Sequence, residues 1–181
     1  MKSESIVLGG GCFWCLDPLF SNLKGVTDVT CGYAGGAKKN PTYYSLTEDD
    51  STHAEVVKVT YNPETISLET ILEIFWTMHD PTTLNRQGND VGPQYRSIVL
   101  YQDENQLKAV NKSIDKVAKK LWGTPLTTEI VPLEVFWPAE DEHQDYFEKH
   151  PNQAFCQLVI NPKINKLKQK FQPLLKGFSP S

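Results

Sequence analysis

Three consecutive glycines at residues 9–11 separate two stretches that differ in hydrophobic periodicity. The four residues before them, 5–8, are mostly apolar and β-branched, which predicts a short buried strand. After them, apolar residues recur at near-helical spacing over residues 19–23, and Gly25 is typical of a helix end. The chain is therefore expected to turn from a strand into a helix at the glycines, whose missing side chains let the backbone bend freely.

Cys12 directly follows the glycines, at this predicted turn from strand to helix. Amide donors and the helix dipole at a helix start favour a thiolate over a thiol. Phe13 and Trp14 come next and place two aromatic side chains beside the sulfur. The pattern indicates a nucleophilic cysteine next to an apolar pocket, although lone cysteines are also common as small buried core residues.

Cys12 and Cys15 also form a C-x-x-C pair, which is typical of thiol redox sites in a cytosolic βαβ setting. From the spacing alone, a redox role ranks first, a buried structural role second and a zinc ligand third. A phosphate-binding loop is a further interpretation of three glycines that precede a helix. The sequence has neither the spaced glycines of a dinucleotide fingerprint nor a Gly-Lys-Ser/Thr ending, which argues against such a loop.

A chain of 181 residues is long enough to bury a substantial core, and we expect one catalytic domain spanning residues 1–181. The net charge of −4 shows no excess of basic residues, which argues against a nucleic-acid partner. No apolar run reaches membrane-spanning length, and residues 6–8 are too few for the apolar core of a signal peptide. We therefore expect a cytoplasmic protein, in which four cysteines indicate metal binding or redox catalysis rather than structural disulfides.

Hydrophobic periodicity predicts strands over residues 5–8, 28–33, 53–61, 97–101 and 127–136. It predicts helices over residues 18–24, 68–78, 104–121 and 162–175. Asp17 would cap the first helix, with Pro18 at its first position, and Pro132 would place the last strand at an edge or a bulge. This order predicts an α+β two-layer sandwich with a mixed sheet and a split βαβ, ferredoxin-like core. The crossover rule places both early helices on one side of that sheet.

Residues 53–61 alternate in polarity, and the alternation places a carboxyl on the apolar side of a strand. Glu55 shares its face with Val57 and Val59, the side expected to be buried. A buried carboxyl either finds a partner or has its pKa raised by desolvation. Glu55 is thus either a salt-bridged or edge-exposed glutamate, or an acid that stays protonated near neutral pH and can donate a proton.

Three other segments bear on function. Residues 82–93 form a long polar loop, and loops of that length are more often functional than idle. Residues 139–149 have a polar, helical pattern, which we interpret mainly as a solvated face. Cys31 shares a strand face with apolar neighbours, which favours a buried core thiol.

Short motifs follow one another along most of the chain, from Gly9 to Cys156. They are Gly11-Cys12-Phe13-Trp14, Gly32-Tyr33-Ala34-Gly35-Gly36, Asn40-Pro41-Thr42-Tyr43, His53-Ala54-Glu55, Phe75-Trp76, His79-Asp80-Pro81-Thr82, Asn85-Arg86-Gln87-Gly88-Asn89-Asp90, Gln94-Tyr95-Arg96-Ser97 and Glu142-His143-Gln144-Asp145-Tyr146. Together they resemble the peptide methionine sulfoxide reductases of the A type. One such motif would be weak evidence, whereas all of them in this order are specific.

The resemblance implies reduction of the S epimer of methionine sulfoxide, free or protein-bound, with thioredoxin as the electron donor. By position, Cys12 resembles the nucleophile, and Phe13 and Trp14 resemble the pocket for the substrate methyl group. Glu55 resembles the acid. The groups around the sulfoxide oxygen are matched by Tyr43, Asp90 and Tyr95. On this resemblance no metal, flavin or nicotinamide is required, and we expect a monomer.

The residue types fit the chemistry of a sulfoxide. Its sulfur is electrophilic only if its oxygen is polarised or protonated, which a protonated Glu55 and two phenols could do. Cys12 then attacks the sulfur, methionine departs, and Cys12 remains as a sulfenic acid. A second cysteine condenses with it to a disulfide that an external dithiol reduces. A pocket that holds the methyl group and the oxygen separately would accept only one epimer.

The choice of resolving cysteine stays open between two residues. Cys156 follows a Pro-Asn break and matches the position of a resolving cysteine in the family, so we favour it. Cys15 stands where many members have glycine, and it could instead close a small ring with Cys12. Asp17 stands where glutamate is frequent. The C-terminus lacks the Gly-rich, cysteine-bearing tail of some members, which predicts one resolving step rather than a relay of two.

Two other function classes are considered. A general thiol–disulfide oxidoreductase would use Cys12 and Cys15 and would not need Glu55. A zinc-binding interaction module would need a second C-x-x-C pair or a closely spaced histidine pair, and the sequence has neither.

Overall fold

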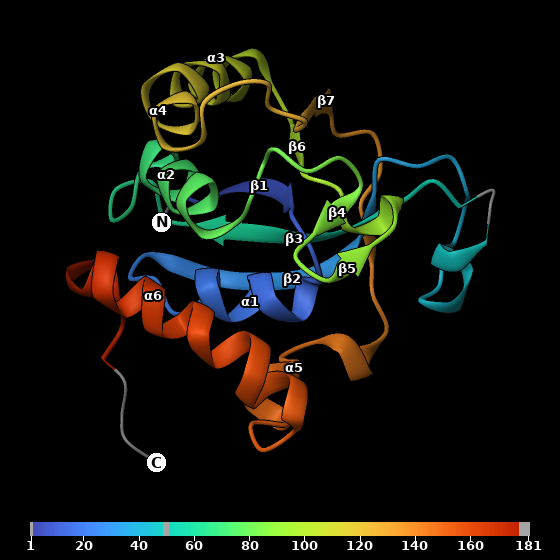
Figure 1. Ribbon diagram of the computed structural model, residues 1–181. Helices are drawn as coiled ribbons and strands as arrows, with labels where there is room; N and C mark the ends of the chain where they lie inside the picture. Colours follow the sequence, from blue (N-terminus) through green and yellow to red (C-terminus); the bar gives the residue numbers. More distant parts are fainter. Residues whose placement is uncertain (1, 49–50, 178–181) are drawn as a thin grey trace.

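The computed structural model describes residues 2–48 and 51–177, which form a mixed sheet with helices packed against it (Figure 1). The main sheet has six strands in the order β7-β6-β1-β3-β2-β8. Their bounds are Glu4–Gly9 (β1), Val26–Ala34 (β2), Ala54–Tyr61 (β3), Ile98–Tyr101 (β6), Glu129–Pro132 (β7) and Trp137–Pro138 (β8). A separate hairpin consists of β4 (Arg86–Gln87) and β5 (Asp90–Val91).

The helical elements range from single turns to helices of three turns. The α-helices are Phe13–Ser21 (α1), Leu68–Met78 (α2), Glu104–Ser113 (α3), Lys119–Trp122 (α4), Tyr146–Lys149 (α5) and Asn161–Phe171 (α6). The 3₁₀ turns are Tyr44–Thr47 (η1), Pro93–Tyr95 (η2), Asp141–His143 (η4) and Gln172–Leu174 (η6). Two π-helical turns are Ile114–Ala118 (η3) and Cys156–Ile160 (η5). Within the described ranges, every helix is too short or too polar to cross a lipid bilayer.

Strand β3 lies between β1 and β2 and pairs antiparallel with both. Strands β1 and β2 are therefore parallel, and together with α1 they form the predicted split βαβ unit. Strand β6 pairs antiparallel with β1, and β7 pairs parallel with β6, so the sheet is mixed. The predicted α+β class is confirmed. Pro132 lies in the edge strand β7, as expected for a residue that cannot donate to the ladder.

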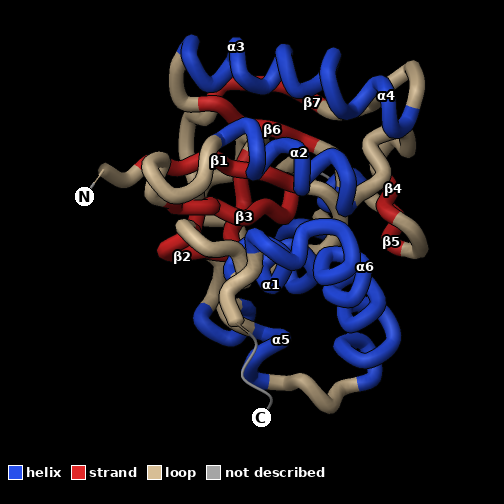
Figure 2. The backbone as a smooth tube through the Cα atoms, turned by 90° about the vertical axis from the view of Figure 1, so that its left-hand side faces the viewer, coloured by secondary structure: helices blue, strands red, loops and turns tan. Residues whose placement is uncertain are grey.

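Helices α1, α2 and α6 cover the face of the sheet that carries the main core. Phe20 of α1, Phe75 of α2 and Leu167 of α6 pack in one cluster with strand residues such as Val57. Both early helices therefore lie on one side of the sheet, as predicted. Figure 2 shows α6 beside α1 on this side. The opposite face has a smaller apolar cluster, which residues 131–136 cover without a helix.

Helix α1 begins at Phe13 rather than at Pro18, and Cys12 is its N-cap residue. Pro18 lies inside the helix, where it removes one backbone hydrogen bond. Burial of Phe13 and Leu16 offsets this loss, because both side chains leave water completely or nearly so. The predicted cap at Asp17 is therefore wrong, and this residue lies buried within the helix.

Two other helix starts are as predicted. The side chain of Ser67 accepts the amide of Thr70 at the start of α2, and Asp103 accepts the amide of Gln106 at the start of α3. Gly123 ends α4 with a φ of 73°, a positive value that glycine adopts without strain.

Several segments converge at one end of the sheet. Strand β1 ends at Gly9, which pairs with Ile98 at the start of β6. Strand β3 begins at the same end, because it is antiparallel to β1. The predicted loop 82–93 contains the β4–β5 hairpin and leads toward β6, again at this end. The turn after β1 therefore lies beside the residues that enter β3 and β6.

Candidate active site

Backbone contacts hold the turn that carries Cys12. Gly11 has a φ of +92°, a conformation that disfavours any side chain. Its amide donates to the carbonyl of Tyr95 over 3.1 Å. A Cβ atom at Gly10 would lie 2.8 Å from the ring of His79. The glycines thus allow the turn to pack closely against its neighbours, with Cys12 at the N-terminus of α1.

Glu55 lies on β3 with 1% of its surface exposed, on the face shared with Val57 and Val59 as the alternation predicted. Its Oε1 accepts the amide of Phe13 over 3.2 Å, and the thiol of Cys12 is close enough to its carboxyl to affect the pKa. Burial raises the pKa of Glu55 from 4.5 to about 8, against the lowering effect of the Phe13 amide and the Cys12 thiol. At neutral pH Glu55 is therefore a protonated acid in contact with Cys12.

Three polar residues from separate segments approach Cys12 and Glu55. Tyr43 precedes η1, Asp90 lies on β5 and Tyr95 ends η2. Burial raises the pKa of all three side chains, and the charges of Glu55 and Cys12 raise the pKa of both tyrosines further. Electrostatic effects of this kind indicate that both tyrosines lie in the neighbourhood of Cys12 and Glu55. At neutral pH both phenols keep the proton that they would donate to a ligand.

Phe13 and Trp14 form the apolar side of the site. Phe13 is fully buried, and its ring centroid lies 5.8 Å from that of Tyr33. Trp14 stacks on Tyr146 with ring centroids 3.7 Å apart and planes 4° from parallel. The ring of Phe155 meets Trp14 edge-on at 5.8 Å. The aromatic wall beside Cys12 is thus built from α1, β2 and the C-terminal segment.

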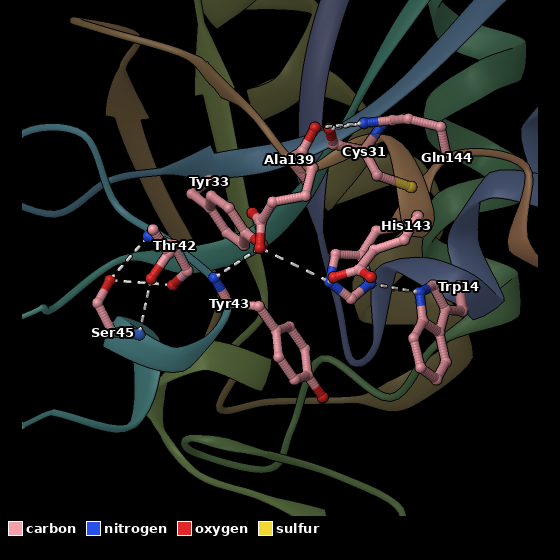
Figure 3. A network of polar contacts seen from close by, with 11 residues as sticks. Trp14, Cys31, Tyr33, Thr42, Tyr43, Ser45, Ala139, His143 and Gln144 are labelled. Carbon is pink, nitrogen blue, oxygen red and sulfur yellow. Dashed lines mark hydrogen bonds and ion pairs between the residues drawn. The ribbon is translucent and has the colours of Figure 1, made fainter.

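His143 lies at the centre of this aromatic wall, although the sequence did not single it out as a site residue (Figure 3). Its ring centroid lies 5.5 Å from that of Phe13, 5.7 Å from that of Trp14 and 4.6 Å from that of Tyr43. Its Nδ1 accepts the indole N–H of Trp14 over 3.2 Å. The interpretation of residues 139–149 as a solvated face is wrong for His143, which is 6% exposed. The sequence feature that could have identified His143 as a site residue is its position inside the Glu-His-Gln-Asp-Tyr motif.

Glu140 connects the aromatic wall to the loop that carries Tyr43. Its Oε2 accepts the backbone amide of Tyr43 over 3.2 Å, and its Oε1 accepts the phenol of Tyr33 over 2.9 Å. These bonds hold the Tyr43 backbone in place, and its ring stacks on His143.

Glu140, Glu142 and His143 also form a group of potential metal ligands, whose ligand atoms lie within 4.8 Å of one another. The indole N–H of Trp14 can only donate, so Nδ1 of His143 accepts and Nε2 carries the proton. A protonated Nε2 has no lone pair for a metal; it lies 3.8 Å from Glu140 and 3.7 Å from Glu142. This donor set fits a neutral histidine that positions Trp14 rather than a metal centre.

Cys12 and Cys15 lie in the first turn of α1, where the amide of Cys15 donates to the carbonyl of Cys12 over 3.0 Å. The neighbouring Cys15, burial and the charge of Glu55 raise the pKa of Cys12 well above its usual value, against the lowering effect of the Trp14 amide. This arrangement therefore disfavours the thiolate expected at Cys12. Cys12 and the ammonium of Lys163 on α6 lower the pKa of Cys15, against the raising effect of burial.

Cys156 begins the π-helical turn η5 and is fully buried. It packs in one cluster with Cys15 of α1 and Ile164 of α6, and Cys12 lies against the same cluster. Both candidate resolving cysteines are thus on the Cys12 side of the helical layer. Cys31 is buried in the main core, as predicted, where its thiol donates to the carbonyl of Phe13 over 3.7 Å.

The family model described as "Peptide methionine sulfoxide reductase" matches residues 4–174. The chain belongs to the peptide methionine sulfoxide reductase family. Its members are oxidoreductases, and the chain is one of them. A relative from Sulfolobus acidocaldarius, named peptide methionine sulfoxide reductase MsrA, is 50% identical over 168 residues, which are 93% of this chain and 95% of the relative.

Solved structures of the family share the fold. Mxr1 from Saccharomyces cerevisiae in its reduced form matches with a TM-score of 0.80 and 36% identity, over 86% of this chain and 90% of that chain. Mxr1 in complex with Trx2 matches with a TM-score of 0.57 and 29% identity, over 80% and 85% of the two chains. These reductases therefore have the same mixed sheet with helices on it.

Proposed function

We propose that this reductase, a single catalytic domain spanning residues 1–181, reduces the S epimer of methionine sulfoxide, free or protein-bound, with Cys12 as the nucleophile. The observation that carries the proposal is the hydrogen bond from the amide of Phe13, the residue next to Cys12, to a buried, protonated Glu55, beside the rings of Phe13 and Trp14. Nucleophile, acid and apolar wall are the three parts that sulfoxide reduction needs.

Glu55 acts first on the sulfoxide oxygen. Its carboxyl is neutral because burial disfavours the charged form, so it donates a hydrogen bond or a proton to the oxygen. The phenols of Tyr43 and Tyr95 are protonated and donate to the same oxygen, and the charge of Asp90 contributes to the raised pKa of both. Withdrawal of electrons through the oxygen makes the sulfur electrophilic.

Cys12 then attacks the sulfur. The oxygen passes from the substrate sulfur to the Cys12 sulfur, methionine leaves, and Cys12 becomes a sulfenic acid. This transfer consumes no net proton, because the proton of the thiol ends on the hydroxyl of the sulfenic acid. The raised pKa of Cys12 is compatible with the reaction, since Glu55 contacts the thiol and can pass protons between sulfur and oxygen.

The stereochemistry follows from the division of the site. Phe13 and Trp14 receive the methyl group on the apolar side, while Glu55, Tyr43 and Tyr95 receive the oxygen on the polar side. The sulfur of the sulfoxide is a stereocentre that carries the methyl group and the oxygen. Only one epimer can therefore place its methyl group on the apolar side and its oxygen on the polar side while its sulfur faces Cys12.

Reduction of the enzyme completes the cycle. A second cysteine, Cys156 or Cys15, condenses with the sulfenic acid to a disulfide, and thioredoxin reduces it. The match to a relative solved in complex with Trx2 supports thioredoxin as the partner. The reaction uses no metal or organic cofactor, and a monomer in the reducing cytoplasm is sufficient for it.

A thioredoxin-coupled assay on the separated S and R sulfoxides tests the proposal. We expect turnover of the S epimer alone, and loss of turnover in Cys12→Ser. Equal turnover of both epimers, or activity of Cys12→Ser, would contradict it. Cys31→Ser is the matched control, because Cys31 is a buried thiol outside the site.

A general thiol–disulfide oxidoreductase is the second candidate, favoured by the adjacent Cys12 and Cys15 in the first turn of α1 and by the lowered pKa of Cys15. That activity does not need an acid at residue 55. Reduction of a small disulfide substrate by Glu55→Gln at the wild-type rate, without any sulfoxide reduction by the wild type, would favour this candidate.

A further inference from the structure

Arg96 is a buried cation that directly follows the site residue Tyr95. It is 8% exposed and lies just after η2. Its Nη1 donates to the carbonyl of Pro93 over 2.9 Å, and its Nη2 donates to the carbonyls of Thr52 and Gly35 over 3.0 and 3.3 Å. A buried guanidinium needs such partners, because burial of an unpaired charge is very unfavourable. One side chain thus joins three loops that are distant in the sequence.

The negative partner of Arg96 lies at the surface. Nε of Arg96 is 3.1 Å from Oε1 of Glu129 on β7, and the Glu129 side chain is 47% exposed. This ion pair does not have hydrogen-bond geometry at Nε. Ion pairs with exposed carboxylates contribute little in water. The three carbonyl bonds, rather than the ion pair, therefore hold the guanidinium.

Two of the three carbonyls lie where strands of the site end and begin. Gly35 directly follows β2, and Thr52 lies two residues before β3. Strand β3 carries Glu55 at its second position, opposite Tyr33 of β2. One planar group thus binds both strands of this pair at the end from which Glu55 projects.

Thr52 is held in a conformation that a β-branched residue avoids. Its φ is +53°, in the left-handed region, where residues other than glycine are strained. Its Oγ1 accepts the amide of Ala37 over 3.1 Å, and its carbonyl accepts Arg96. Without the guanidinium, one of these two restraints is lost, and relaxation of Thr52 would move the start of β3.

The backbone next to Arg96 leads to the nucleophile. The carbonyl of Tyr95 accepts the amide of Gly11, one residue before Cys12, over 3.1 Å. The turn η2 also packs against β3. Tyr95 and Arg96 are therefore a direct bridge, which binds the turn of Cys12 on one side and the segment that leads to Glu55 on the other.

We propose that Arg96 is a positioning residue of this reductase, which fixes the turn of Cys12 and the strand of Glu55 relative to each other. The proposal rests on the proposed function, which gives Cys12 and Glu55 their roles. Arg96 acts through the backbone at Tyr95 and Thr52 rather than on the reacting atoms. The planar guanidinium has donors in fixed directions and holds several carbonyls in one geometry, which the compact ammonium of lysine does not.

The rate of a single turnover tests this role. Reduced protein is mixed with a saturating peptide S-sulfoxide, and the reduced peptide is measured after rapid quenching. Arg96→Lys keeps the charge, and we expect its rate to fall by about 10–100-fold, because small displacements of reacting groups have effects of this size. Glu129→Gln removes the ion pair, leaves the carbonyl bonds and should react at the wild-type rate. A wild-type rate in Arg96→Lys, or an equal fall in Glu129→Gln, would overturn the proposal.

A second control separates positioning from a general loss of stability. Ser113→Ala removes the buried acceptor of the Trp76 indole, between α2 and α3 and away from the site. It should lower the free energy of unfolding but leave the single-turnover rate of the folded protein unchanged. All rates are compared at a temperature at which each variant is folded. A fall in Ser113→Ala as large as that in Arg96→Lys would mean that the effect of Arg96 is not specific.

The double variant Arg96→Lys/Thr52→Asn tests the route through β3. Asparagine adopts a positive φ more readily than threonine does, and its side-chain oxygen can still accept the Ala37 amide. We therefore expect Thr52→Asn to restore several-fold of the rate that Arg96→Lys loses. A double variant as slow as Arg96→Lys alone would show that Arg96 does not act through Thr52.

The protonation of Glu55 provides a readout that does not depend on sulfoxide reduction. The infrared band of its neutral carboxyl is assigned by its absence from Glu55→Gln. Burial raises the pKa of Glu55 to about 8, so we expect the band to disappear at lower pH in Arg96→Lys, where a displaced β3 admits water. Asp90, Cys12 and Cys15 also act on this carboxyl and are unchanged in that variant.

The two readouts separate the positioning role from the proposed function. The same infrared midpoint in Arg96→Lys and the wild type would contradict the positioning role of Arg96. A shifted midpoint in a protein whose wild type reduces no sulfoxide would support that role and count against the proposed function alone.

Discussion

The backbone amide of Phe13 donates to Oε1 of Glu55 over 3.2 Å, which joins the first turn of α1 to the start of β3. The preceding residue, Cys12, carries a thiol that is close enough to the same carboxyl to affect its pKa. Acid and nucleophile are thus held together by two consecutive residues. The ring of Phe13 also belongs to the apolar wall, so this one residue helps to position the acid and to form the pocket.

Replacement of the acid should slow the chemical step. Glu55→Gln keeps an oxygen that can accept the Phe13 amide but has no proton to give to the sulfoxide oxygen. We expect methionine formation in a single turnover to fall by about 10²–10⁴-fold, the usual contribution of a positioned acid. The exposed Glu64→Gln is the control and should react at the wild-type rate. A fall of less than a few fold in Glu55→Gln would remove Glu55 from the mechanism.

The pH dependence should report the same carboxyl. Its pKa of about 8 means that Glu55 is protonated below that pH and ionised above it. We therefore expect the single-turnover rate to fall as the pH rises through about 8, because the acid form disappears. This decline should be missing from the low residual rate of Glu55→Gln. A decline of the same size and midpoint in that variant would assign it to another group.

Sequence pattern was sufficient where a property depends on neighbours along the chain. The alternation around Glu55 predicted its buried face, because side chains on a strand alternate regardless of what covers them. The caps at Ser67 and Asp103 were also predicted, since each bonds to an amide three residues away. The predicted fold class is also confirmed, because the order of strands and helices along the chain can be read from local periodicity.

Pattern was insufficient where distant residues decide the outcome. Asp17-Pro18 has the local form of a helix start, but burial of Phe13 and Leu16 against the sheet begins α1 earlier. His143 lies in a polar segment, and only its contact with Trp14, 129 positions away, buries it in the site. Likewise, the effect of Lys163 on Cys15 depends on α6 packing beside α1, which local pattern does not report.

Asp17 should make the stability of the fold depend on pH. Burial and the charge of Asp145 raise its pKa from 3.8 to about 7 in the folded protein. The folded state therefore binds a proton more tightly than the unfolded state, so the free energy of unfolding falls as the pH rises between these two values. Asp17→Asn should remove this part of the decline, because the amide never ionises.

Denaturant unfolding of wild type and Asp17→Asn at several pH values measures the effect. The variant should gain stability relative to the wild type as the pH rises from 3.8 to about 7, and the difference should stay constant above that range. Asp141→Asn, an exposed carboxyl, should show no such gain. Parallel stability curves for Asp17→Asn and the wild type would show that Asp17 does not titrate as its burial predicts.

The indole of Trp14 should lose its position when His143 cannot accept its N–H. A buried donor without a partner costs about 1–3 kcal/mol, so His143→Phe should lower kcat/KM for the S sulfoxide by about 5–150-fold. His143→Asn has an oxygen close to the place of Nδ1 and should recover much of that loss. The fluorescence of Trp14, isolated by replacing the other tryptophans with phenylalanine, should shift in His143→Phe and return toward the wild type in His143→Asn. Equal kinetics in the two variants would mean that ring packing against Phe13 and Tyr43, and not the hydrogen bond, is what His143 contributes.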